Sequence, residues 1–132
     1  MNIEKMKQLI ELSKLFDSEQ TEQKQSSSIY DYYIGKQVII RTYSAGVHYG
    51  TLNRVENDSA VELKNSRRIH YWDGANSLTD IALGGILNKK DSRITKKLPS
   101  IVLNNTIEII ECTEKSIIDL DSFPEWTKIW LN

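Results

Sequence analysis

The chain has 132 residues, of which 39% are hydrophobic and 27% are charged, and its formal net charge is -1. This length fits one domain of ordinary soluble composition, and the near-neutral charge excludes a global electrostatic attraction to nucleic acid or membrane. A single cysteine, Cys112, excludes an internal disulfide or a multi-cysteine zinc site and suits a reducing compartment.

The N-terminal region predicts a helix followed by a linker. Apolar residues recur every three or four positions over residues 1–16, which is typical of an amphipathic helix that docks on its own domain or on a neighbouring subunit. Charged residues interrupt this pattern, so we expect neither a signal peptide nor a membrane span, and we expect a cytoplasmic protein. Residues 17–28 (DSEQTEQKQSSS) predict a flexible linker, which leaves residues 29–132 as one β-rich domain.

Residues 36–72 predict short antiparallel strands with tight turns. We expect strands at 36–43 and 47–55, and then either two strands at 60–64 and 67–72 or one long bent strand. The first strand is apolar on both faces near its middle, and Gly50 predicts a bulge or a close approach of another backbone or of a ligand. This pattern predicts an α+β fold with a small, strongly curved, barrel-like antiparallel sheet.

The remaining chain predicts two short helices around a basic loop and a hairpin. Ser77 begins a helix over 78–83, and Thr113 begins another over 114–120. Residues 87–99 predict a mobile basic loop, and residues 101–111 predict a closing hairpin with its turn at Asn104-Asn105. The tail carries tryptophans 126 and 130, which we expect to pack on the sheet or at a subunit contact.

The strand at 67–72 is the main candidate site. Alternation places its residues on two faces, with Arg67, Ile69 and Tyr71 on one and Arg68, His70 and Trp72 on the other. An arginine beside a tryptophan can hold a phosphate and stack a base. The alternative is a strand with one core face and one exposed ladder that binds nothing. We favour Arg68, His70 and Trp72, and Arg67 is the weakest member.

Two further elements are candidates for the same site. The turn at Ser44, Ala45 and Gly46 exposes backbone N–H groups that can cradle an anion, although such turns are common without a ligand. The helix start at Asn76 and Ser77 can bind phosphate, or it can simply cap its own helix. Side chains near the turn complete the predicted set, namely Arg41, Tyr43 and His48. We expect the strand, the turn and the helix start to converge.

Catalytic signatures are absent from the sequence. His48 and His70 do not form a HExxH pattern, no phosphate-binding glycine motif occurs, and Cys112 lies among acidic neighbours that oppose a thiolate. We therefore predict a non-enzymatic protein with no catalytic residues, no metal and no cofactor.

Several segments resemble a family of small uncharacterised bacteriophage and prophage proteins. They are residues 41–48 (RTYSAGVH), 50–52 (GTL), 67–75 (RRIHYWDGA) and 106–113 (TIEIIECT). The resemblance implies a phage-encoded binding protein of the host cytoplasm, such as one that blocks a defence nuclease or sequesters a nucleotide immune signal.

The chain also resembles the Sm-like, SH3-like barrels. Residues 34–40 (IGKQVII), 50–52 (GTL) and 61–63 (VEL) follow the Sm pattern in order, but about 25 residues are inserted after Trp72 and the closing RG motif is missing. This resemblance implies a single-stranded RNA binder.

Taken together, the sequence predicts a counter-defence protein, in the manner of a sponge, that holds a phosphate-bearing, nucleotide-like ligand. We expect a homo-oligomer without membrane contact. The alternatives are an inhibitor that binds a host defence protein directly, through its basic loop and tryptophan tail, and an Sm-like RNA binder.

Overall fold

The computed structural model describes residues 3, 7 and 28–127 and contains two units, residues 1–32 and 33–132. In the first unit, Ile3 and Lys7 are helical and a 3-10 helix, η1, spans Ile29–Tyr32. Ser28 immediately precedes η1, and its hydroxyl accepts a 3.1 Å hydrogen bond from the Tyr30 backbone N–H. Most of the predicted helix over 1–16 and of the linker over 17–28 lies outside the described residues, as does Trp130.

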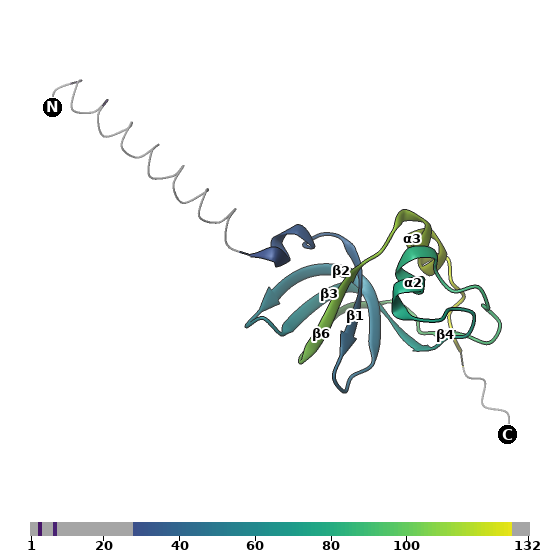
Figure 1. Ribbon diagram of the computed structural model, residues 1–132. Coiled ribbons are helices and arrows are strands. Elements are labelled where there is room, and N and C mark those ends of the chain that lie inside the picture. The colour runs from purple at the N-terminus through teal and green to yellow at the C-terminus, as the bar shows by residue number, and fades with distance from the viewer. Residues whose placement is uncertain (1–2, 4–6, 8–27, 128–132) are drawn as a thin grey trace. The chain divides into compact units, whose positions relative to one another are not determined.

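The second unit is a small α+β fold with a six-stranded antiparallel sheet and two helices (Figure 1). The strands are β1 (Gln37–Thr42), β2 (Val47–Glu56), β3 (Ala60–Tyr71), β4 (Arg93–Ile94), β5 (Leu98–Leu103) and β6 (Thr106–Glu111). The helices are α2 (Leu78–Gly84) and α3 (Glu114–Asp121). The strand order is β4-β3-β2-β1-β6, and β5 also pairs with β3.

β3 is one long strand that bends at a bulge. Asn65 has a positive φ of 51°, and the register with β2 shifts between Tyr49 and Thr51. Gly50 lies opposite this bulge, where a Cβ atom would stand 3.0 Å from the Lys64 carbonyl oxygen. The predicted close approach at Gly50 is confirmed, and so is the single bent strand.

The predicted hairpin over residues 101–111 is wrong in its pairing. β5 pairs with β3 and β6 pairs with β1, and Asn104-Asn105 links the two strands. The Tyr43 N–H donates to the Asn105 carbonyl at 3.0 Å, and the Thr106 N–H donates to the Ser59 carbonyl at 3.0 Å. The sheet therefore curves so strongly that Asn104-Asn105 connects β5, which pairs with β3, to β6, which pairs with β1. Because β5 and β6 do not pair in the part of the chain described, the sheet is not a closed barrel.

Both faces of the sheet are buried near its middle, as the apolar pattern of the first strand predicted. Successive residues of β1 supply two separate cores, since Ile39 joins one cluster and Val38 and Ile40 join the other. The first cluster also contains Tyr49, Ile69, Ile81, Ala82, Ile86, Ile94, Cys112, Leu120 and Phe123. The second also contains Leu52, Val61, Leu63 and Leu103.

The helices α2 and α3 lie against each other and complete the first cluster (Figure 1). Ser77 caps α2 by accepting from the Asp80 N–H, and Thr113 caps α3 by accepting from the Ser116 N–H, so both predicted caps are confirmed. The Ser116 hydroxyl donates to the Ile81 carbonyl at 2.6 Å, which fixes one helix to the other.

The segment predicted as a mobile basic loop is bonded along its length. It contains β4, whose Ile94 pairs with Ile69 of β3. The Ser92 hydroxyl donates to the Asn88 carbonyl at 2.6 Å, and Lys89 forms an ion pair with Asp119 of α3. This charged stretch is thus held in place by contacts with β3 and α3. No helix within the described residues is long and apolar enough to cross a membrane.

Candidate functional site

Two adjacent arginines of β3 have opposite environments. Arg67 is only 2% exposed, and its Nε and Nη1 donate to the carbonyls of Thr95 and Leu120 at 2.8 and 2.7 Å. Burial lowers the pKa of Arg67, while the charges of Glu125 and Asp121 oppose this shift. Its placement in the ligand site is corrected, because this guanidinium joins β3 to α3 and faces no solvent. Arg68 is exposed.

Arg68 lies directly opposite His48 in the β2–β3 ladder, which places both side chains on one face. His48 is 1% exposed, and burial lowers its pKa, an effect that the charge of Arg68 increases and the bond to Ala45 opposes. The neutral ring donates its Nε2–H to the Ala45 carbonyl at 2.9 Å, since a carbonyl can only accept. His48 is therefore a neutral ring that fixes the turn.

This burial of His48 predicts a pH-dependent stability. The unfolded side chain titrates near its ordinary value of about 6.5, whereas the folded one binds its proton at lower pH. Between the folded pKa and about 6.5, the unfolded state thus binds more protons than the folded state. The contribution of His48 to the free energy of unfolding is therefore complete above about pH 6.5 and declines as pH falls toward the folded pKa. We expect His48→Gln to lose less melting temperature than the wild type between pH 7.5 and 5.5. A parallel decline of both proteins would contradict this role, and His70→Gln is the control for an exposed histidine.

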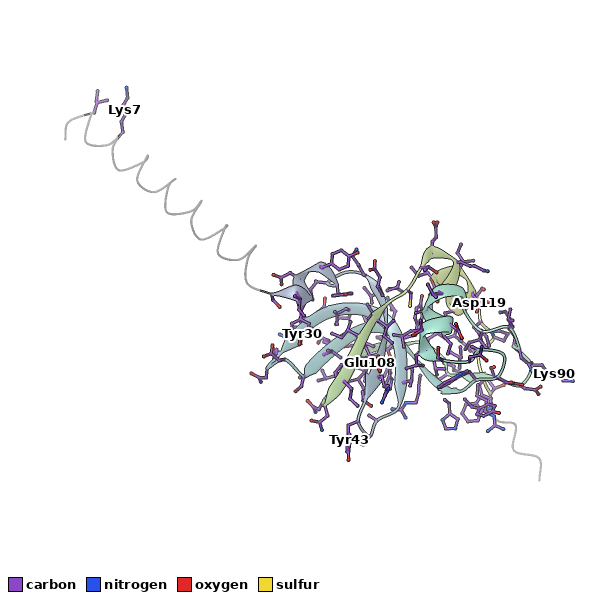
Figure 2. All side chains as sticks on the ribbon, viewed as in Figure 1. Lys7, Tyr30, Tyr43, Lys90, Glu108 and Asp119 are labelled. Atoms are coloured by element: carbon purple, nitrogen blue, oxygen red, sulfur yellow. The ribbon has the colours of Figure 1, made fainter. Side chains whose placement is uncertain are left out.

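The β1–β2 turn has most of its polar backbone groups satisfied internally. The Ala45 N–H donates to the Thr42 hydroxyl at 2.8 Å, and the Thr42 N–H and hydroxyl both donate to the Gly46 carbonyl. Gly46 itself has a φ of 85°, which a glycine adopts without strain. Thr42 therefore closes the turn at Ser44–Gly46 from within, next to Arg68, and takes up the Ala45 N–H. Tyr43 projects from it with 80% exposure (Figure 2).

A cluster of rings and cations, exposed except for the half-buried Trp126, lies at the far end of β3. The His70 ring stacks on the Trp126 ring, with centroids 4.9 Å apart and planes inclined by 10°. The Arg93 guanidinium lies 5.5 Å from the Trp126 centroid and 6.0 Å from that of Tyr71. Trp126 is held there because its backbone N–H donates to the Ile94 carbonyl at 2.7 Å. We call Arg68, His70, Tyr71, Arg93 and Trp126 the aromatic–basic surface.

Two predicted members lie elsewhere. Trp72 follows the end of β3, where alternation no longer applies, and it packs on the same core cluster as Ile69. It therefore does not share a face with Arg68 and His70, which corrects the prediction. Arg41 forms a 2.8 Å ion pair with Glu108 of β6.

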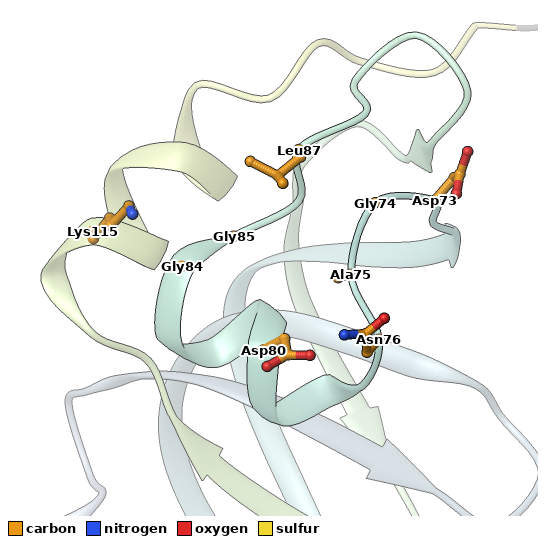
Figure 3. Close-up of a pocket in the computed structure, with 9 residues that line it drawn as sticks. All are labelled: Asp73, Gly74, Ala75, Asn76, Asp80, Gly84, Gly85, Leu87 and Lys115. Carbon is orange, nitrogen blue, oxygen red and sulfur yellow. The ribbon is translucent and has the colours of Figure 1, made fainter.

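The predicted helix start borders a separate cavity of about 580 Å³. Figure 3 shows it rimmed by Asn76, by Asp80 of α2, by Asp73 of the loop after β3 and by Lys115 of α3. Ser77 is occupied as the cap of α2. Two carboxylates against one ammonium disfavour a phosphate here. The three predicted elements thus do not converge: the turn and the strand adjoin each other, and the helix start belongs to this acidic cavity.

A family model described as a domain of unknown function (DUF6948) matches residues 35–120. The chain belongs to this family. The comparison with curated proteins gave no match. The DUF6948 region contains four members of the aromatic–basic surface and ends before the fifth, Trp126. In this chain, a residue outside the family region therefore supplies the ring that stacks on His70.

Arg93 and Trp126 were not among the predicted site residues. The sequence predicts Arg93 only as part of the basic loop over residues 87–99, and Trp126 only as a tail residue that packs on the sheet or at a subunit contact. No local pattern joins positions 70, 93 and 126, because β4 and the tail meet β3 only through tertiary pairing. Among the described residues, no group of three or more histidine, cysteine or acidic side chains is placed to hold a metal.

Proposed function

We propose that this protein is a non-enzymatic binding protein whose aromatic–basic surface holds a nucleotide-like ligand, that is, a base carrying phosphate. The observation that carries the proposal is the stack of the exposed His70 ring on the half-buried Trp126 ring, with the Arg93 guanidinium 5.5 Å from the indole centroid. Parallel rings offer a flat apolar surface to a base, and stacking of this kind contributes about 1–3 kcal/mol per base.

The cations next to the rings suit the phosphate. Arginine presents several N–H donors in a planar fork that matches phosphate oxygens, and it is always charged. Arg68 lies two residues before His70 in β3, both are exposed, and Arg93 lies across the ladder from Tyr71, just past a register shift between Ile69 and Tyr71. A ligand stacked on the rings would thus meet a guanidinium on either side. The acidic cavity offers no such pairing of ring and cation.

We further propose a biological setting that the sequence resemblance alone supports. The protein would act in the cytoplasm of a phage-infected host, as a homo-oligomer, and would sequester a nucleotide signal of host defence. Its curled sheet would be a relative of the SH3-like and Sm-like barrels, with the β5–β6 link in place of full closure.

Thermal denaturation with a panel of mononucleotides and cyclic nucleotides tests the proposal. A ligand at about ten times its Kd adds about 1.4 kcal/mol to the free energy of unfolding, which raises the Tm by about 5 °C for a domain of this size. We expect one or more of the panel to give this shift and Trp126→Ala to abolish it. Tyr43→Ala is the matched control, since it removes an 80% exposed ring from the turn. Equal shifts in wild type and Trp126→Ala would refute the site.

A further inference from the structure

Basic residues continue beyond the rings along the β3–β4 edge. The Thr95 N–H donates to the Arg68 carbonyl at 3.0 Å, and the Arg68 N–H donates to the Thr95 hydroxyl at 2.9 Å. Two exposed lysines, Lys96 and Lys97, follow Thr95 directly, and the next residue, Leu98, pairs with Ser66. They are therefore anchored beside the Arg68 end of the surface.

Arg93 lies at the other end of this row of basic residues, which comprises Arg68, Lys96, Lys97 and Arg93. It lies opposite Tyr71 in the β3–β4 ladder, and Tyr71 is three residues beyond Arg68 in β3. The rings of His70 and Trp126 thus lie between two groups of cations, with Arg68, Lys96 and Lys97 on one side and Arg93 on the other. Glu125 is the neighbouring carboxylate, and its charge acts on the buried Arg67.

The length of this row exceeds a single nucleotide. Ser66 and Tyr71 are five residues apart in β3, which corresponds to about 17 Å at about 3.3 Å per residue. Each nucleotide of a strand adds one phosphate, so a strand lying along this row presents more than one phosphate to its cations. A mononucleotide would leave most of these cations without a partner.

We propose that the aromatic–basic surface, extended by Lys96 and Lys97, binds single-stranded nucleic acid, with a base stacked on the His70–Trp126 pair and the backbone following the cations. The inference rests on the proposed function and narrows its ligand from nucleotides in general to a strand. A duplex does not fit, because its bases stack on each other and present no free face to a protein ring.

Fluorescence anisotropy with labelled oligo(dT) of ten nucleotides tests the inference, with unlabelled TMP, shorter oligo(dT) and a dT·dA duplex as competitors. We expect affinity to increase at least about tenfold from TMP to a six-nucleotide strand, and the duplex to compete poorly. Log affinity should fall with log salt by about 0.7 per phosphate contacted, so Lys96→Ala/Lys97→Ala should reduce the slope by about 1.4. Trp126→Ala should weaken binding at least about fivefold.

Arg54→Ala is the matched control for loss of one positive charge, because Arg54 is exposed in β2 and paired with Glu56 and Glu62. It should leave affinity and slope unchanged. If TMP competes as well as the six-nucleotide strand, the strand proposal is overturned while the proposed function stands. If neither mononucleotides nor strands bind, both are overturned. Strand binding that survives Trp126→Ala and keeps its slope in the double lysine variant also overturns the inference.

Discussion

Arg67→Ala is expected to lower the free energy of unfolding by about 3 kcal/mol or more. The guanidinium is 2% exposed and donates to the Thr95 and Leu120 carbonyls. Its loss leaves the Thr95 carbonyl without this donor, and the Leu120 carbonyl keeps only its backbone bonds at the end of α3, such as the one from the Phe123 N–H at 3.4 Å. A buried acceptor left unsatisfied costs about 1–3 kcal/mol, and the vacated volume adds a cavity term. Urea denaturation followed by circular dichroism measures the difference.

The adjacent arginine is the natural control for this prediction. Arg68→Ala removes the same side chain one position along β3, but from an exposed site, and we expect its stability to change by no more than about 0.5 kcal/mol. Arg67→Met, which keeps the apolar stem, should retain part of this loss of stability because both carbonyls still lack the guanidinium donor. Equal effects of Arg67→Ala and Arg68→Ala would show that the buried contacts add nothing to stability.

The parts of the fold that could be predicted depend on local chemistry. Ser77 and Thr113 cap helices because each hydroxyl accepts from an N–H three residues on, a contact within one turn. Strand pairing is not local in this way. Asn104-Asn105 is an equally good turn for a hairpin, and only the curl of the sheet brings β5 to β3 and β6 to β1.

The sequence predicts only part of the candidate site, because the rest depends on contacts between distant segments of the chain. Alternation along β3 correctly separates Arg67 from Arg68, but it cannot tell which face another element covers. Here α3 covers the Arg67 face, since Leu120 accepts from that guanidinium. The stacking partner of His70 lies 56 positions away at Trp126, and it reaches β3 through the bridge between Ile94 and Glu125. Such a partner is set by tertiary pairing, whereas alternation within β3 alone predicts Trp72 as the aromatic of the site.

Gly85→Ala is expected to lower the free energy of unfolding by about 3 kcal/mol, because it disrupts the contacts that connect the end of α2 to α3. Gly85 has a φ of 82°, a conformation that strains any residue with a Cβ atom. That atom would stand 2.2 Å from the Asp119 Oδ2 and 2.6 Å from the Asp119 Cβ, so the side chain of Asp119 would have to move as a whole. Asp119 is held by the Ile86 N–H at 2.9 Å and by Lys89, and both contacts would be lost.

Gly84→Ala gives this prediction its sharpest control. Gly84 is the last residue of α2, and a Cβ atom built on it has no heavy atom within 4 Å. Alanine favours the helical conformation over glycine by up to about 1 kcal/mol, so this variant should be as stable as the wild type or slightly more stable. Thermal denaturation of the two variants separates strain from helix propensity. A stable Gly85→Ala would mean that Asp119 moves freely and that α2 and α3 are joined mainly by their apolar contacts and the Ser116 hydrogen bond.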